Sequence, residues 1–137
     1  MPTRRFGQAD LPAARELLRQ LGYELPAAEL EARLARVLSA RDHHVAVAEA
    51  DGRIVGLLHV FERPALEKPC EAVVQAIVVD AKARRRGIGR ALMEVAEAWA
   101  RARGLPSVAL STRHAQAFYA ELGYARVATS DLMRKAL

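Results

Sequence analysis

The segment Ile77–Leu92 contains the residues of this chain whose types and spacing could do chemistry. An apolar stretch leads into three consecutive arginines, Arg84–Arg86, which are followed by Gly87 and, one residue further, by Gly89. A loop of this kind that opens a helix points several backbone N–H groups at one place, and the helix dipole adds positive potential there. Glycine lets the backbone adopt positive φ and approach a ligand closely. The pattern predicts a phosphate or pyrophosphate site with arginine side chains on its rim.

Two other phosphate motifs fit this segment less well. A dinucleotide fingerprint needs a third glycine, where this chain has Leu92. It also follows its strand directly, whereas the seven residues of Asp80–Arg86 intervene here. A Walker loop needs Gly-Lys followed by Ser or Thr, and the sequence contains no such triplet. The alternative without a ligand is that the arginines are solvated and only cap a helix.

The elements around this loop predict an α/β fold, a mixed sheet that is antiparallel at first and has helices on both faces. Apolar periodicity and turn signals such as Asp51-Gly52 set the order β-α-α-β-β-β-α-β-α-β-β. The expected strands are Thr3–Gly7, His44–Ala50, Ile54–Phe61, Ala72–Asp80, Val108–Ser111, Tyr124–Ala128 and Leu132–Lys135, and the helices begin near Asp10, Pro26, Ile88 and His114. Because Ala72–Asp80 is the most apolar strand, we expect it to be central and buried on both faces.

Composition indicates a single globular domain over residues 1–137. With 52% hydrophobic residues and one cysteine, the chain is neither disordered nor a disulfide scaffold. No apolar run approaches the roughly 18 residues of a membrane span, and Met1–Arg5 lacks the apolar stretch of a secretory signal. The lone Cys70 and the lack of an export signal favour a cytoplasmic location. No Cys/His cluster has the spacing of metal ligands, so we expect no metal.

The net charge is +5, because 21 lysines and arginines outnumber 16 acidic residues. Nucleic acid, an anionic membrane and a small polyanionic ligand would each fit this balance. Most of the excess is arginine in an alanine-rich chain, which a GC-rich coding bias also explains. A nucleic-acid role for Arg84–Arg86 and Arg90 is the least favoured, because the chain lacks a recognition-helix pattern and interleaved exposed aromatics.

Two motifs resemble those of the GCN5-related N-acetyltransferase (GNAT) family. The first is Arg84-x-x-Gly87-x-Gly89 after Ile77-Val78-Val79, and the second is Ala115-x-x-Phe118-Tyr119-x-x-x-Gly123-Tyr124. The expected order of elements also matches the GNAT-like acyl-CoA N-acyltransferase fold over essentially the whole chain. That fold has a central, mixed, mostly antiparallel sheet flanked by helices. Helix capping and ordinary helix packing could each explain one motif, but neither explains both.

The resemblance implies an acetyl-CoA-dependent N-acetyltransferase that needs no metal. In the family, the central strand pairs with the pantetheine arm, and the loop cradles the pyrophosphate through its N–H groups. By position, the cofactor-binding residues are Ile77, Val78, Val79, Arg84, Arg85, Arg86, Gly87, Ile88, Gly89, Arg90 and Thr112. Tyr119 occupies the position of the family's general acid. A tyrosine hydroxyl titrates at about 10, so it is protonated at neutral pH and can donate to a leaving thiolate.

Two positions depart from the family pattern. Thr112 stands where relatives often have Asn, and Gln75 stands where many have the glutamate that acts as base. An amide cannot take up a proton as a base does. Alternative bases, acting directly or through water, are Glu71, His59, Glu62 and His114. The expected acceptor-site residues are Tyr23 and Gln75, with Leu25 beside Tyr23 in the link between the first two helices; packing against the helix pair would explain Tyr23 equally well.

Several functions therefore stay open. The leading one is an enzyme that moves an acetyl group directly to a primary amine, without an acyl-enzyme. The compact chain favours a small-molecule acceptor over a protein N-terminus or lysine. The second is a non-catalytic acyl-CoA-binding module, which Gln75 and Thr112 support. We expect no nucleic-acid or membrane partner, and a homodimer is possible by analogy with the family.

Overall fold

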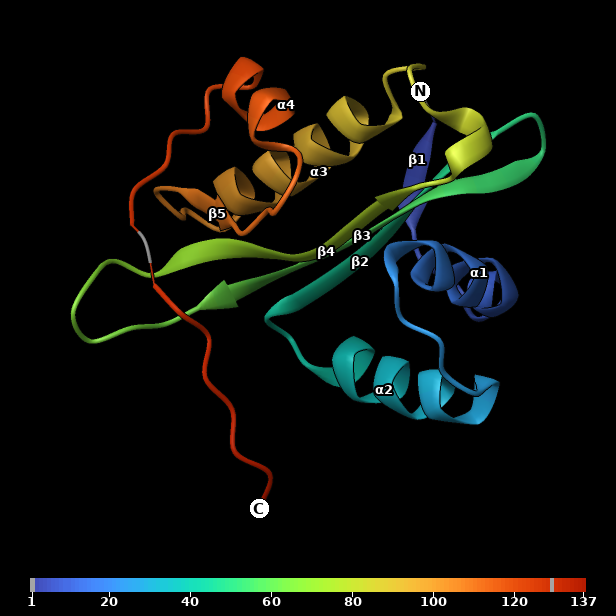
Figure 1. Ribbon diagram of the computed structural model, residues 1–137, viewed down its shortest axis with the longest axis horizontal. Coiled ribbons are helices and arrows are strands. Elements are labelled where there is room, and N and C mark those ends of the chain that lie inside the picture. The colour runs from blue at the N-terminus through green and yellow to red at the C-terminus, as the bar shows by residue number, and fades with distance from the viewer. Residues whose placement is uncertain (1, 129) are drawn as a thin grey trace.

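The computed structural model describes residues 2–128 and 130–137, and it shows one twisted sheet with helices on both faces (Figure 1). The strands are β1 (Thr3–Arg5), β2 (His43–Ala50), β3 (Arg53–Arg63), β4 (Glu71–Val79) and β5 (Val108–Leu110). The helices are α1 (Leu11–Leu21), α2 (Ala27–Ser39), α3 (Ile88–Ala102) and α4 (Gln116–Glu121), with 3-10 turns at Gln8–Asp10 and Ala81–Ala83. The predicted mixed sheet and the order of elements from β1 to α4 are confirmed.

The five strands lie in the order β1-β2-β3-β4-β5. Neighbours from β1 to β4 are antiparallel, and β5 runs parallel to β4 after the crossover through α3. A two-residue turn joins β2 to β3, because Ala50 pairs with Arg53. Asp51 and Gly52 have φ values of 54° and 72°, as the tight hairpin turn requires. The Asp-Gly signal thus set the pairing next to the turn, and the register shifts further along, between Ala48 and Glu49.

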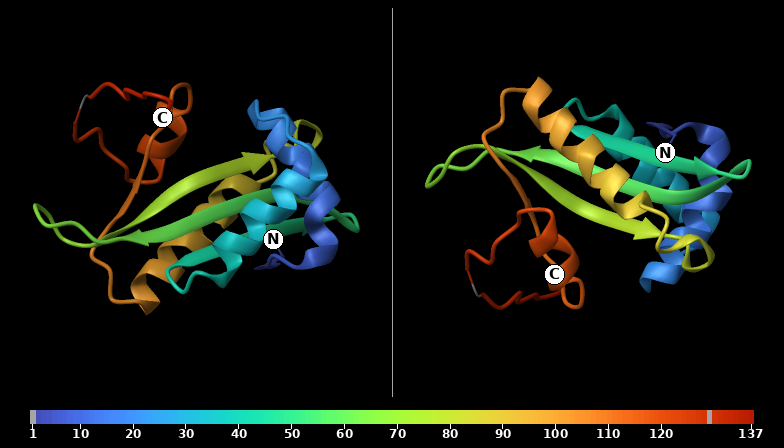
Figure 2. Two further views of the ribbon diagram at one scale, coloured as in Figure 1. Left: turned by 90° about the horizontal axis from the view of Figure 1, so that it is seen from below. Right: turned by 90° about the horizontal axis from the view of Figure 1, so that it is seen from above.

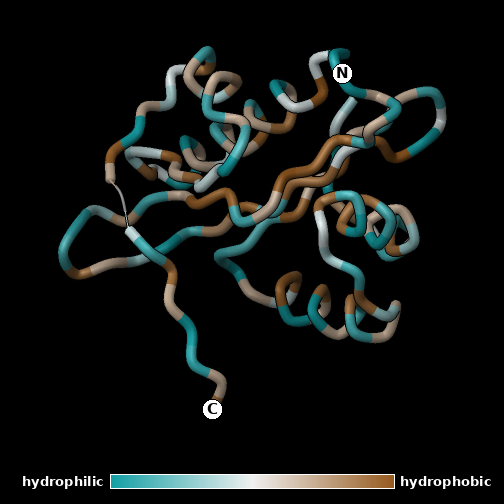
Figure 3. Tube along the Cα trace, viewed as in Figure 1, coloured by the Kyte–Doolittle hydropathy of each residue, from teal (hydrophilic) through white to brown (hydrophobic). Residues whose placement is uncertain are grey.

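Helices lie on both faces of the sheet (Figure 2). Each face carries its own apolar core. On one face, Leu17 of α1 and Leu30 of α2 pack with Val47 and Leu57 of the sheet. The other face is crossed by α3, and Leu92 lies in the core there. Apolar residues follow the central strands through the middle of the molecule (Figure 3). Burial on both faces holds the layers together, since removing apolar surface from water drives folding.

Gly56 of β3 lets α3 approach the sheet closely. A Cβ at this position would lie 2.9 Å from Leu92 Cδ1 and 3.0 Å from Ile88 Cγ2. Side chains do not approach this closely, so the position must remain glycine for the first turn of α3 to sit where it does. The start of α3 is therefore fixed against the strand beside β4.

Two expectations about strands are wrong. The segments Tyr124–Ala128 and Leu132–Lys135 form no strand, and residues 125–128 and 130–137 are exposed. Apolar and polar residues alternate in both segments, but neither segment has a neighbouring strand. A strand's register is fixed by burying one of its faces, and these segments have nothing to bury it against. In addition, β4 is only partly buried, with Gln75 exposed and Ile77 half-buried. The three-residue β5 is too short to cover all of β4.

The described residues include no helix with the length and apolar character that a membrane crossing requires. Nor does this part of the chain bring three His, Cys, Asp or Glu side chains together into a group that could hold a metal ion. His43 and His44 lie on opposite faces of β2, since His43 stacks on Phe61 and His44 stacks on Trp99 of α3.

Candidate functional site

The open part of β4 begins at a β-bulge. Val74 and Ala76 both pair with residues of β3, whereas Gln75 between them has no partner there. On the other side, β5 pairs with β4 only over Ala72–Val74. A bulge bends its strand and increases the local twist. Beyond it, the edge of β4 over residues 75–79 has no strand partner among the described residues.

The predicted cofactor-binding residues Ile77, Val78 and Val79 lie in this open part of β4. Val78 is buried in the core beneath α1 and α2, and Ile77 and Val79 pack against the core beneath α3. The side chains therefore anchor the strand, and what faces outward at the edge is backbone. An extended ligand can pair with such an edge as an additional strand would.

The loop that follows β4 is held at its first residues. The Asp80 carboxylate accepts a hydrogen bond from the Lys82 backbone N–H at 3.0 Å, and this bond lowers the pKa of Asp80. The Ala81 N–H donates to the Gln20 side-chain oxygen at 2.9 Å. Gln20 thus ties the end of α1 to the loop, a contact between residues 61 positions apart that no local sequence signal indicates.

Arg85 and Gly87 turn this loop into α3. Their φ values are 65° and 78°, in the left-handed region that glycine adopts freely and other residues rarely enter. The Gly87 carbonyl accepts the Ala91 N–H at 3.0 Å, which starts the helix. The N–H groups of Ile88–Arg90 belong to the first turn, so they have no acceptor within the helix. With the helix dipole, they give this helix start a positive potential, which favours an anion.

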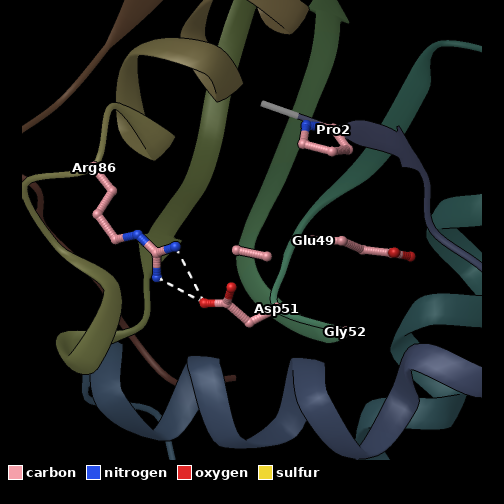
Figure 4. A pocket seen from close by; sticks show the side chains of 6 residues that line it. Pro2, Glu49, Asp51, Gly52 and Arg86 are labelled. Atoms are coloured by element: carbon pink, nitrogen blue, oxygen red, sulfur yellow. Dashed lines mark hydrogen bonds and ion pairs between the residues drawn. The ribbon is translucent and has the colours of Figure 1, made fainter.

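The arginine side chains around this helix start are exposed at Arg84–Arg86 and Arg90. One of them is held by the β2–β3 turn. Both terminal nitrogens of Arg86 lie 3.1 Å from Asp51 Oδ2, and Figure 4 shows Arg86 pointing from the loop toward Asp51. The pocket beside this ion pair is also lined by Glu49. The rim of the site is therefore basic, and the Asp51 carboxylate restrains one of its arginine side chains, Arg86.

The two sequence motifs are in direct contact. A Cβ at Gly89 would lie 3.2 Å from Phe118 Cζ, so the Phe118 ring sits against the first turn of α3. The expectation that Gly89 adopts positive φ is wrong, because positive φ in this loop is confined to Arg85 and Gly87. Gly89 is needed for the close approach of α4. Its small size therefore determines where the second motif lies.

Tyr119, the predicted general acid, is the one buried residue of α4. Its ring meets Phe118 edge-on at 5.0 Å between centroids and Tyr124 edge-on at 6.0 Å. Burial raises the pKa of the Tyr119 hydroxyl above its usual value. The phenol is therefore neutral at physiological pH and can act as a hydrogen-bond or proton donor.

Glu97 fixes α4 to α3 in a way that the sequence pattern missed. The Tyr124 hydroxyl donates to Glu97 Oε2 at 2.8 Å. Burial and this carboxylate together raise the pKa of Tyr124 well above its ordinary value. Glu97 also pairs with Arg101 one helical turn further on, and that contact is longer, at 3.7 Å. The conspicuous Phe118-Tyr119 pair thus depends on a third aromatic residue held by a carboxylate.

Thr112 has a structural partner. Its Oγ1 accepts a hydrogen bond from the Ala115 N–H at 3.1 Å, just before α4 begins. The side chain is half-buried. A threonine hydroxyl that accepts one bond can still donate its own proton. Thr112 therefore caps the turn into α4 and still has a donor for a ligand.

The two predicted acceptor residues lie on different elements. Tyr23 is 63% exposed in the loop between α1 and α2, so it is not packed against the helix pair. Leu25 in the same loop is half-buried, and its carbonyl accepts a bond from Arg15 Nε at 2.9 Å. Gln75 is the exposed bulge residue of β4. Because Gln20 ties the end of α1 to the loop after β4, the Tyr23 loop is connected to the same end of the sheet.

The four candidate bases have different surroundings. Glu62 binds Arg103 at 3.0 Å, Glu71 binds Arg63 at 2.6 Å, and His114 is exposed before α4. His59 pairs across the sheet with Ala76, next to the bulge, and its Nε2 lies 2.9 Å from His43 Nδ1. Burial lowers the pKa of His59 to about 4. Of the four, His59 is the neutral imidazole that pairs across β3 and β4 next to the bulge.

Comparison with known proteins gives the family. The model of the acetyltransferase (GNAT) family matches residues 11–124, a range that contains the open strand, the loop and both motifs. A putative acetyltransferase from Agrobacterium tumefaciens is 26% identical, with a TM-score of 0.88 over 98% of this chain and 100% of that one.

Two further solved structures share the fold. An aminoglycoside N-acetyltransferase in complex with CoA is 22% identical, with a TM-score of 0.88 over 99% of this chain and 95% of that chain. Glucosamine-6-phosphate N-acetyltransferase from Arabidopsis thaliana is 22% identical, with a TM-score of 0.83 over 98% and 97% of the two chains.

A curated relative matches over a shorter stretch. N-alpha-acetyltransferase 80 of Mus musculus is 48% identical over 59 residues, which is 43% of this chain but only 19% of that protein. This chain thus matches about a fifth of its relative's length. The family model covers most of the chain, and the chain belongs to the acetyltransferase (GNAT) family.

Proposed function

We propose that this protein transfers an acetyl group from acetyl-CoA directly to a primary amine of a small molecule. The observation that carries the proposal is the open edge of β4 beside the N–H-rich first turn of α3. An acyl-CoA has the two parts that fit these features, an extended amide-bearing pantetheine arm and a pyrophosphate. CoA bound to a structural neighbour of the same fold supports the choice of donor.

The donor would lie along the backbone and not along side chains. Its pantetheine amides pair with the edge of β4 at Ile77–Val79, and its pyrophosphate accepts N–H groups from the start of α3. The residues proposed to hold the phosphates are Arg84, Arg85, Arg86, Gly87, Ile88, Gly89 and Arg90, whose arginine side chains are exposed. Thr112 donates its hydroxyl to the pantetheine arm. The backbone N–H freed where β4 and β5 separate polarises the thioester carbonyl.

The reaction proceeds in one transfer. The neutral amine attacks the thioester carbon, and a C–N bond forms as the C–S bond breaks. The amine loses one proton to a base, and Tyr119 gives its hydroxyl proton to the departing CoA sulfur. The products are an amide and free CoA thiol. Tyr119 suits this role because burial keeps it protonated.

His59 is the best-placed base. It pairs across the sheet with Ala76, beside the bulge, and a neutral imidazole has a lone pair that can take the amine proton directly or through water. His43 Nδ1 lies 2.9 Å from His59 Nε2, and this contact orients the His59 imidazole. Glu62 and Glu71 are less suited, because each is already bound to an arginine.

The acceptor is proposed to be a small amine between Tyr23 and Gln75, both of which are exposed. The aminoglycoside and glucosamine-6-phosphate enzymes among the structural neighbours support a small acceptor. The stretch shared with N-alpha-acetyltransferase 80 supports a protein N-terminus as the second candidate. The proposal includes no metal and no nucleic acid, and the single free Cys70 favours a cytoplasmic setting.

Thermal unfolding with and without acetyl-CoA tests the donor site, with adenosine as the control. A ligand present at about 100 times its Kd adds about 2.7 kcal/mol, which shifts the Tm by several degrees. A shift with acetyl-CoA alone supports the donor and justifies an assay of thiol release with aminoglycosides, amino sugars and N-terminal peptides. Binding without thiol release from any amine would support a non-catalytic module. The absence of a shift at millimolar acetyl-CoA would overturn the proposal.

A further inference from the structure

Three neighbouring strands bring a group of rings together on one face of the sheet. His43 of β2 pairs directly with Phe61 of β3, and their rings stack with 5.1 Å between centroids and 11° between planes. The His59 ring lies 5.1 Å from that of His43 and 6.2 Å from that of Phe61. Val73 of β4 pairs with Phe61 from the other side, so its side chain shares this face. We call His43, His59, Phe61 and Val73 the aromatic face.

The aromatic face belongs to the side of the sheet that carries α1 and α2, but it lies outside their core. Side chains alternate along a strand, and Val45, two residues after His43, is buried beneath these helices. Among the described residues, Phe61 and Val73 pack with neither apolar core. In the left view of Figure 2, β3 and β4 run on past α1 and α2 toward their hairpin loop. The rings therefore pack mainly on one another, and their outer surface is open to a ligand.

The aromatic face adjoins the bulge of β4. His59 pairs across the sheet with Ala76, and the exposed bulge residue Gln75 comes directly before Ala76. A base must come within hydrogen-bond distance of the amine that it deprotonates, or reach it through one water. An acceptor whose nitrogen lies at His59 therefore has its other atoms near the rings around His59, which are those of His43 and Phe61.

The charges beside the aromatic face do not suit an acceptor with several ammonium groups. Glu71, two residues before Val73 on β4, is bound by Arg63 at 2.6 Å and accepts a bond from the Ser107 hydroxyl at 3.0 Å. Burial lowers the pKa of His59 to about 4, so its ring is uncharged at physiological pH. This part of the sheet thus presents flat, uncharged rings, and the carboxylate next to them is already engaged.

We propose that the acceptor is a monoamine whose nitrogen is joined by a short alkyl chain to an aromatic ring, and that this ring packs on the aromatic face. The inference rests on the proposed function and names the class of amine that the same site takes. Aromatic rings attract one another at centroid separations of about 4.5–7 Å. The 6.2 Å between His59 and Phe61 calls for a short link between the nitrogen and the ring of the acceptor. An aminoglycoside has several ammonium groups and no flat ring, so it fits this surface less well.

The first test compares matched amines by their rates of thiol release from acetyl-CoA. Phenethylamine and cyclohexylethylamine have the same chain and a similar size, but only phenethylamine has a flat aromatic ring. We expect kcat/KM to be about threefold to tenfold higher for phenethylamine, the factor that ring–ring contacts add to apolar burial. An aminoglycoside should be a poorer acceptor than either. Equal values for the two matched amines, or a preference for the aminoglycoside, would overturn the proposal.

The second test removes the ring of Phe61 and keeps an apolar side chain. Phe61→Leu should raise KM for phenethylamine by about threefold to tenfold and change KM for cyclohexylethylamine little. Its kcat should stay near that of the wild type, because Phe61 does not touch the reacting atoms. Leu66→Ala is the matched control, since Leu66 is 107% exposed in the β3–β4 loop. An unchanged ratio of the two KM values in folded Phe61→Leu would contradict the proposal.

Thermal unfolding shows whether Phe61→Leu is folded. If it is not, Val73→Ser tests the same surface, because Val73 lies beside Phe61 and outside both cores. This variant should raise KM for phenethylamine and leave the Kd for acetyl-CoA unchanged. A folded Val73→Ser variant with the KM of the wild type would count against the aromatic face.

A binding measurement separates failure of this inference from failure of the proposed function. Isothermal titration of phenethylamine in the presence of CoA measures ring binding without acetyl transfer. Binding that Phe61→Leu weakens, without thiol release from any amine, would refute acetyl transfer and support the aromatic face. Thiol release from other amines, without binding of phenethylamine, would refute the aromatic acceptor and leave the proposed function standing. The absence of both would overturn both.

Discussion

Phe118 of α4 lies against Gly89 of α3, with its ring carbon Cζ 3.2 Å from the place that a Cβ of residue 89 would occupy. The second motif of the sequence therefore rests directly on the first. A methyl group at position 89 would require Phe118 to give way by a few tenths of an ångström, and a larger side chain would displace it further. The two motifs are far apart in the sequence, and this contact between Phe118 and Gly89 brings them together.

Gly89→Val should weaken acetyl-CoA binding by at least tenfold. The added side chain displaces Phe118 and crowds the helix start where the pyrophosphate is proposed to lie. Ala98→Val, at an exposed position of the same helix, is the matched control and should leave the Kd unchanged. Isothermal titration with acetyl-CoA gives both values. Equal affinities would remove the first turn of α3 from the donor site.

Tyr119→Phe should lower kcat by about 10²–10⁴-fold while the Kd for acetyl-CoA changes little. The ring packing is preserved, and only the proton donor is lost. Tyr124→Phe is the comparison, because it removes the bond to Glu97 and should reduce the Tm more than kcat. Steady-state thiol release and thermal unfolding separate the two effects. If both variants lose only stability, Tyr119 is not the general acid.

The stability of the fold should fall as the pH drops from 6.5 to 4. His59 has a pKa of about 4 in the folded protein, against 6.5 ordinarily, so in this window the unfolded chain binds a proton that the folded chain does not. The loss is at most about 3 kcal/mol, is complete below the folded pKa and is absent above 6.5. Burial also lowers the pKa of His44, which acts in the same direction.

Urea unfolding at several pH values checks this slope. His59→Gln should flatten it, whereas His114→Gln, at an exposed position, should not. The lowered pKa values of Asp10 and Asp80 act only below 3.8, and that of Glu16, held by Arg19, acts only below 4.5, so most of the window is free of carboxyl contributions. A His59→Gln variant with the slope of the wild type would contradict the assignment.

Asp51→Asn should tighten acetyl-CoA binding, and Arg86→Gln should weaken it. Asp51 holds both terminal nitrogens of Arg86 at 3.1 Å, so removing its charge frees the guanidinium for a phosphate. Both effects should lie within about tenfold, because the pair is exposed to solvent. Both should shrink at high salt. Equal shifts in the same direction for the two variants would contradict competition between Asp51 and the donor.

Much of the fold follows from local signals. Asp51-Gly52 set the first hairpin, Gly87 set the start of α3, and helical spacing gave α1 to α4 within a few residues. Period and turn chemistry are properties of adjacent residues, so they can be read along the chain. The two closing strands could not be predicted in this way, because a strand needs a neighbour, and alternation alone does not supply one.

The same distinction between local signals and contacts of distant segments applies to the candidate site. By itself the sequence located the glycine- and arginine-rich loop at Arg84–Gly89, which we propose holds phosphate, and the protonated Tyr119, because both depend on residue type and short spacing. Only the tertiary structure decided the bulge at Gln75, the open edge of β4 and the contact of Phe118 with Gly89. These depend on where strands separate and helices meet. Such distances arise from packing between segments far apart in the chain, which no local pattern records.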